Sequence, residues 1–117
     1  AANRNLSVAA VTPLADGSDH GGSLRNPPSF CNVVGFRPSF GRVPQWPKSQ
    51  PWTSMSVDGP IARSVRDVAL LMTVLAGPDP RSPVAIDEPG SVFGGALARD
   101  FKGVRIAWSR RLGRYPV

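Results

Sequence analysis

The sequence contains only one cysteine, Cys31, and only one histidine, His20. A single thiol cannot form an intrachain disulfide, and one thiol with one imidazole gives too few ligands for a structural zinc site. The sequence also has no apolar run of about 18 residues and no charged start followed by an apolar stretch, so neither a membrane span nor a secretory signal is predicted. We therefore expect a soluble protein without membrane contact, and take the cytoplasm as its default location.

Acidic residues are few, and lysines are fewer. Twelve arginines and two lysines against eight acidic residues give a net charge of +6. An excess of positive charge raises the question of nucleic-acid binding. Apart from a closing run at Arg110, Arg111 and Arg114, however, the arginines are scattered along the chain. They form no basic stripe interleaved with stacking aromatic residues. The charge pattern therefore disfavours nucleic acid as a partner.

The chain is short and rich in residues that form turns. Its 117 residues, 41% of them hydrophobic, suffice for one domain with a modest core but not for two. Twelve glycines and thirteen prolines exceed the usual share of these residues. We expect short regular elements joined by many turns.

Capping and periodicity signals predict a helix over residues 64–76. Ser64 and Asp67 have the S-x-x-D spacing of a capping box, and Gly77 follows as a stop signal. Within the segment, apolar residues recur at three- and four-residue spacing. They predict a buried face made of Val65, Val68, Leu71, Met72 and Leu75.

The remaining segments predict short strands and loops. Residues 32–36 and 104–108 are apolar runs typical of strands. Residues 16–28 are rich in turn formers, and four prolines predict an irregular loop over 37–52. Residues 6–14 fit either the end of a helix or a short buried strand.

Gly21, Gly22 and Ser23 form the segment with the clearest capacity for chemistry. Two glycines let backbone N–H groups turn toward a developing oxyanion, and a serine directly after them can attack the same carbonyl. The same residues also fit a tight turn in which Ser23 caps the next segment. The local pattern favours the turn and leaves the nucleophile open.

Other catalytic arrangements fit less well. A compact triad of Ser23, His20 and Asp19 has poor geometry, because adjacent residues point apart in an extended chain. His20 fits a turn residue. Cys31 fits a small buried hydrophobe better than a nucleophile, since no second histidine is available to activate it.

Two long stretches resemble the amidase signature family of serine hydrolases. They read GSDHGGSLRNPPSFCNVVGFRPSFGRVP, residues 17–44, and MSVDGPIARSVRDVALLMTVLAGPDPRSP, residues 55–83. The resemblance implies an α/β fold with a mixed β-sheet core flanked by helices, incomplete in this chain. It also implies hydrolysis of a small-molecule linear amide through an acyl-enzyme, with neither a metal nor an organic cofactor.

The resemblance implies a role for each residue of the glycine segment. Ser23 is the expected nucleophile. The backbone N–H groups of four consecutive residues are expected to form the oxyanion hole: His20, Gly21, Gly22 and Ser23.

Three further residues match supporting positions of the family. Ser18 matches a hydroxyl residue that supports the site, and Asp19 and Arg25 match charged residues that brace the loop. Physical chemistry agrees, because an Asp and an Arg that flank a glycine turn can pair across it.

The family's other catalytic groups are a lysine base and a second serine, which lies in a G-G-S-S-G-G motif upstream of the nucleophile. Residues 1–10 contain no such motif, and Lys48 and Lys102 both follow Ser23. We therefore expect residues 1–117 to be the central portion of one amidase domain, without the upstream segment or the C-terminal half. The proton shuttle then lies outside this chain, with the rest of the amidase as a second chain among the expected partners. An exposed apolar surface is expected where missing elements would pack.

Two alternatives to a general amidase remain. One is the glutaminase-type subunit of a tRNA amidotransferase. The other is a non-catalytic amidase fragment that only binds a partner.

Overall fold

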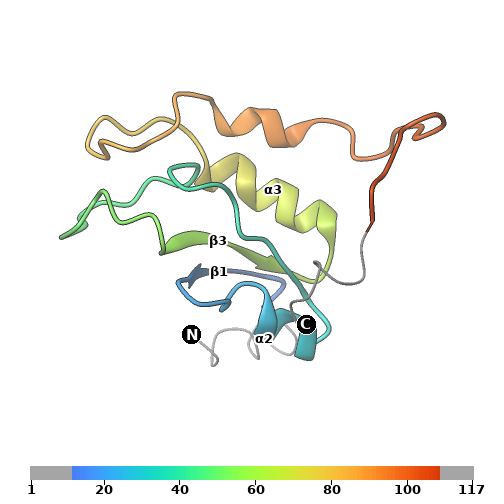
Figure 1. Ribbon diagram of the computed structural model, residues 1–117, viewed down its shortest axis with the longest axis horizontal. Helices are drawn as coiled ribbons and strands as arrows, with labels where there is room; N and C mark the ends of the chain where they lie inside the picture. The colour runs from blue at the N-terminus through green and yellow to red at the C-terminus, as the bar shows by residue number, and fades with distance from the viewer. Residues whose placement is uncertain (1–11, 109–117) are drawn as a thin grey trace.

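The computed structural model describes residues 12–108. Its strands are β1 (Leu14–Asp19), β2 (Val34–Gly35) and β3 (Val57–Ala62). Its helices are α2 (Asn26–Phe30), α3 (Val65–Leu75) and the 3₁₀ helix η1 (Gly90–Gly94). Figure 1 shows three layers, with α3 lying between the sheet and η1, and α3 contacts both.

The three strands form one antiparallel sheet in the order β1-β3-β2. On one side of β3, Leu14 pairs with Ala62 and Asp19 pairs with Val57. On its other side, Val34 also pairs with Ala62. The central strand is almost wholly buried, because β1 and β2 cover its edges and α3 packs against it. The sheet therefore places the end of β1, where the glycine segment begins, beside the start of β3.

The predicted helix over 64–76 is confirmed, with α3 spanning Val65–Leu75. The Asp67 N–H donates to Ser64 Oγ over 3.2 Å, as the capping signal predicts. Val68 and Met72 are buried against the sheet side, and Leu75 is half-buried. The prediction that Val65 is buried is wrong: it is 57% exposed, because it opens the helix where no described element covers the apolar face.

Several other predictions need correction. Residues 104–108 form no strand, because among the described residues no strand pairs with them. The segment 16–28 is not only turns, since it holds most of β1 and the start of α2. The strand within 32–36 is confirmed but short, and the irregular loop over 37–52 is confirmed. The prediction for residues 6–14 falls largely outside the described residues, with Leu14 as the first residue of β1.

Large apolar side chains are exposed on the described part of the chain. On α3 they include Leu70 and Val74, which are 56% and 76% exposed. A hollow of about 520 Å³ opens beside Leu70, between α3 and residues 93–98. Ile106 and Trp108 are exposed further along the chain.

Candidate active site

The candidate nucleophile Ser23 lies in a short loop between β1 and α2. Gly22 O accepts the N–H groups of Arg25 and Asn26 over 2.9 and 2.7 Å, which closes a tight turn around Ser23. Gly22 itself has φ +122°, and a Cβ there would lie 2.8 Å from Asn26 Nδ2. The turn therefore requires glycine directly before the serine.

Asp19, at the end of β1, holds the Ser23 loop through hydrogen bonds to its side chain. Its side chain is fully buried. Oδ1 accepts the Gly22 N–H over 2.7 Å, and Oδ2 accepts the Leu24 N–H over 3.2 Å. These are the N–H groups of the two residues that flank Ser23, so one carboxylate holds the backbone on both sides of the candidate nucleophile.

Two arginines neutralise the buried carboxylate. Arg25 donates to it from Nε over 2.9 Å and from Nη2 over 3.2 Å, which confirms the pairing predicted across the glycine turn. Arg37 Nη1 lies 3.2 Å from Oδ1. The hydrogen bonds from Arg25 hold the pKa of the Asp19 carboxyl well below its usual range, against burial, which raises it. Asp19 is therefore an anionic structural centre and not a proton donor at neutral pH.

The loop leaves some backbone donors uncommitted. The Gly22 N–H donates to Asp19 Oδ1 in this structure. Among the described residues, the N–H groups of Gly21 and Ser23 donate to no protein acceptor. The N–H groups of His20, Gly21, Gly22 and Ser23 remain the predicted oxyanion donors.

The other candidate side chains lie around the loop without forming a triad. Ser23 is half-buried, while Ser18 and His20 are exposed. The Asp19 carboxylate binds arginines and N–H groups, and within residues 12–108 no hydrogen bond or ion pair joins it to the His20 side chain. Cys31 is half-buried and carries a free thiol, so the prediction of a buried hydrophobe holds only in part.

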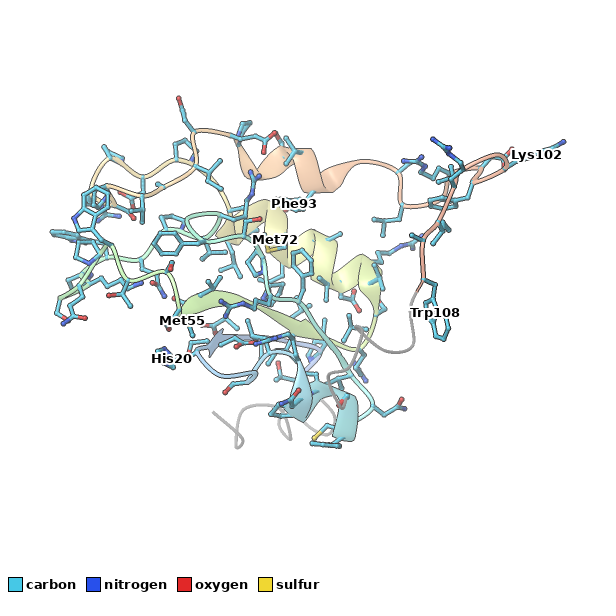
Figure 2. The ribbon with its side chains drawn as sticks, viewed as in Figure 1. His20, Met55, Met72, Phe93, Lys102 and Trp108 are labelled. Carbon is cyan, nitrogen blue, oxygen red and sulfur yellow. The ribbon has the colours of Figure 1, made fainter. Side chains whose placement is uncertain are left out.

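Neither lysine of the sequence supplies a base to Ser23 in the described structure. Lys48 Nζ donates to Thr53 O over 3.3 Å and lies over the Phe40 ring. Figure 2 shows Lys102 at the opposite end of the molecule from His20, which is three residues before Ser23. The hollow beside α3 is lined by residues from Arg66 to Ala98 and includes no residue of the Ser23 loop.

Two further kinds of feature do not occur within residues 12–108. No group of three or more histidine, cysteine or acidic side chains is arranged there to hold a metal ion. No helix in that range has the length and apolar character needed to cross a membrane.

The family described as Amidase matches residues 7–116. The chain belongs to the amidase signature family. It is 41% identical over 106 residues to an acylamidase of Rhodococcus erythropolis, covering 91% of this chain and 22% of the relative. It is 46% identical over 100 residues to the A subunit of glutamyl-tRNA(Gln) amidotransferase from Synechococcus sp. (strain CC9605), covering 85% and 20%. The chain thus spans about a fifth of the length of these relatives.

Solved amidase signature enzymes share its fold. A bacterial aryl acylamidase superposes with a TM-score of 0.65 at 40% identity, over 72% of this chain and 18% of that one. A 6-aminohexanoate cyclic dimer hydrolase gives a TM-score of 0.67 at 34% identity, over 74% and 19%. The described α/β unit is therefore part of the amidase signature fold.

Sequence reasoning missed Arg37 and the strand β3. Arg37 lies eighteen residues after Asp19, with no local motif that pairs them. In β3, the run Asp58, Gly59 and Pro60 breaks the apolar alternation by which strands are recognised. The pairing register of β3 with β1 positions the Ser23 loop, and this register is seen only in the folded structure.

Proposed function

We propose that this chain carries the nucleophile of a serine amidase and that Ser23 forms the acyl-enzyme. The main observation is the pair of hydrogen bonds from the N–H groups on either side of Ser23 to the Asp19 carboxylate. They fix the backbone of a half-exposed serine whose own N–H has no protein acceptor in the described structure. Membership of the amidase signature family supports the same assignment.

In the proposed reaction, Ser23 Oγ attacks the amide carbonyl carbon and loses its proton to a base outside this chain. The N–H groups of His20, Gly21, Gly22 and Ser23 are the proposed donors to the oxyanion that forms. The C–N bond then breaks as the leaving nitrogen accepts a proton. Water hydrolyses the resulting ester, which releases the acid and restores the Ser23 hydroxyl. Residues 1–117 act here as the central portion of one amidase domain.

A glutaminase-type subunit of a tRNA amidotransferase is the second candidate. It is favoured by the 46% identity to the Synechococcus amidotransferase protein, against 41% to the Rhodococcus acylamidase. Both candidates use the same acyl-enzyme. Release of ammonia from glutamine, compared with hydrolysis of simple anilides, distinguishes them.

The test uses a hybrid enzyme in which this chain replaces the matching 106 residues of the Rhodococcus acylamidase. A fluorophosphonate probe, followed by peptide mapping, is expected to label Ser23. The label is expected to vanish in Ser23→Ala and to persist in Ser54→Ala, an exposed serine outside the loop. His20→Ala is expected to keep most activity, because only its backbone is used. The isolated chain is expected to be inactive, since a serine without its base is a weak nucleophile.

Label on Ser18 or Cys31 in place of Ser23 would overturn the assignment. A hybrid that folds and takes no label would support the third hypothesis, a non-catalytic fragment that binds a partner.

A further inference from the structure

Arg37 connects the Ser23 loop to a second segment of the chain, residues 54–56. Its Nη1 donates to the Asp19 carbonyl, at the end of β1. Its Nη2 donates to the Met55 carbonyl over 3.1 Å. Because guanidinium is planar and rigid, one side chain fixes the position of one backbone segment relative to the other.

The sheet register brings the same two segments together. Asp19 pairs with Val57, so the chain after β1 and the chain before β3 emerge at the same end of the sheet. Figure 2 shows His20 and Met55 at that end. The Met55 segment therefore lies beside the loop that carries Ser23.

Met55 presents an apolar side chain at this position. It is 56% exposed, although its backbone is held by Arg37. An exposed methionine on a fixed backbone suits contact with varied apolar groups, because the thioether chain is unbranched and adaptable. The exposed aromatic residues of the preceding loop, Trp46 and Trp52, differ in this respect, since no hydrogen bond or ion pair in the described structure joins them to the Ser23 loop.

We propose that Met55 contacts an apolar substituent of the amide substrate and that Arg37 is the positioning residue that holds it there. This inference rests on Ser23 being the nucleophile. Met55 then determines specificity, whereas Arg37 touches no substrate and acts through the Met55 backbone. A lysine at position 37 keeps the positive charge near Asp19 but cannot join two carbonyls with a rigid fork.

The experiment measures kcat and KM in the hybrid enzyme described above. One substrate series lengthens the acyl group of an anilide from acetyl to hexanoyl, and a second varies the amine of an acetamide from methyl to phenyl. Met55→Ala is expected to raise KM about tenfold for the larger member of one series, which identifies the side of the amide that it contacts. The acetyl methylamide, which carries the smallest groups on both sides of the amide, is expected to show the smallest change in KM in Met55→Ala.

Leu70→Ala is the matched control, because Leu70 is also 56% exposed but lies on α3. Arg37→Lys is expected to reproduce the loss of selectivity while the probe still labels Ser23. The double variant is expected to resemble Met55→Ala alone, because both changes act on one contact.

Unchanged selectivity in Met55→Ala, or additive effects in the double variant, would overturn the inference while a labelled Ser23 leaves the proposed function intact. An unlabelled Ser23 in the unsubstituted hybrid would overturn both.

Discussion

Asp19 Oδ1 lies 2.7 Å from the Gly22 nitrogen, and the carboxylate's other oxygen accepts the N–H of Leu24. Ser23 is thus enclosed by two backbone hydrogen bonds to one buried anion. This arrangement fixes the serine without using its hydroxyl or its N–H. The predictions that follow test this loop and the core beneath it.

Asp19→Asn is expected to lower the free energy of unfolding by about 3 kcal/mol. This is the low end of the range for breaking a buried ion pair, because the Arg25 side chain is 57% exposed and stays partly solvated. Urea unfolding of the chain and the variant measures the loss. Asp87→Asn, an exposed acid, serves as control and is expected to change stability by less than about 0.5 kcal/mol.

Stability is expected to fall in acid because of Asp19. Hydrogen bonds from Arg25 hold the pKa of the Asp19 carboxyl below the usual 3.8. The Asp19 carboxylate therefore binds a proton less readily in the folded chain than in the unfolded chain. The contribution is therefore fully present above about pH 5 and is lost progressively as the pH falls through about 4 and below. Urea midpoints between pH 7 and pH 2 measure it. A slope that is the same in Asp19→Asn would contradict the prediction.

Arg81 is expected to set the acidity of Asp79. Two hydrogen bonds from the Arg81 side chain and one from its backbone lower the pKa of Asp79 to about 2. Arg81→Leu is expected to move this pKa upward, toward the usual 3.8, because only the backbone N–H remains as a donor. An NMR titration of the carboxyl carbon checks it. Arg63 is an exposed arginine elsewhere in the chain, and Arg63→Leu is expected to leave the midpoint of the Asp79 titration unchanged.

Gly22→Ala and Gly21→Ala form a matched pair within the loop. Alanine at position 22 must adopt φ +122°, and its Cβ approaches the Asn26 side chain closely. Gly22→Ala is therefore expected to lower the free energy of unfolding by about 1–3 kcal/mol and to slow the labelling of Ser23. At Gly21 the added Cβ has nothing within 4 Å, and the N–H is kept. Gly21→Ala is therefore expected to keep nearly the unfolding free energy and the Ser23 labelling rate of the unsubstituted chain. Equal effects at the two positions would refute the description of the turn.

Met72→Ala is expected to destabilise the chain by about 2–5 kcal/mol, because its side chain is fully buried on α3. Val74→Ala, on the same helix but 76% exposed, is the control and is expected to change little. Thermal unfolding followed by circular dichroism compares the two. Similar melting temperatures for both variants would show that α3 is not held to the sheet by this face.

The sequence predicted what local chemistry determines. The start of α3 was predicted from Ser64 and Asp67. The Asp67 N–H donates to the Ser64 side chain within one helical turn. The pairing of Asp19 with Arg25 followed from their places on either side of the glycines. In each case the partners are close along the chain, so spacing alone brings them together.

Long-range pairing decided the rest. Residues 104–108 have a strand's composition but no strand beside them in the described chain, whereas β3 contains Gly59 and Pro60 and is a strand because β1 and β2 pair with it. A Cβ at Gly59 would lie 2.3 Å from Phe36 O, so the residue that hides the strand in the sequence is needed for its packing. The contacts of Arg37 are equally distant in sequence.

The strand order β1-β3-β2 has a consequence for synthesis on the ribosome. The stretch that holds β1, Ser23 and β2 leaves the ribosome before β3 does, but in the described structure both of its strands pair with Val57–Ala62. Until that later segment has left the exit tunnel, the Ser23 loop lacks the central strand of the described sheet, which positions it. In a nascent chain arrested before Val57, neither β1 nor β2 has its described partner strand, so the candidate site forms only after β3 has also been synthesised.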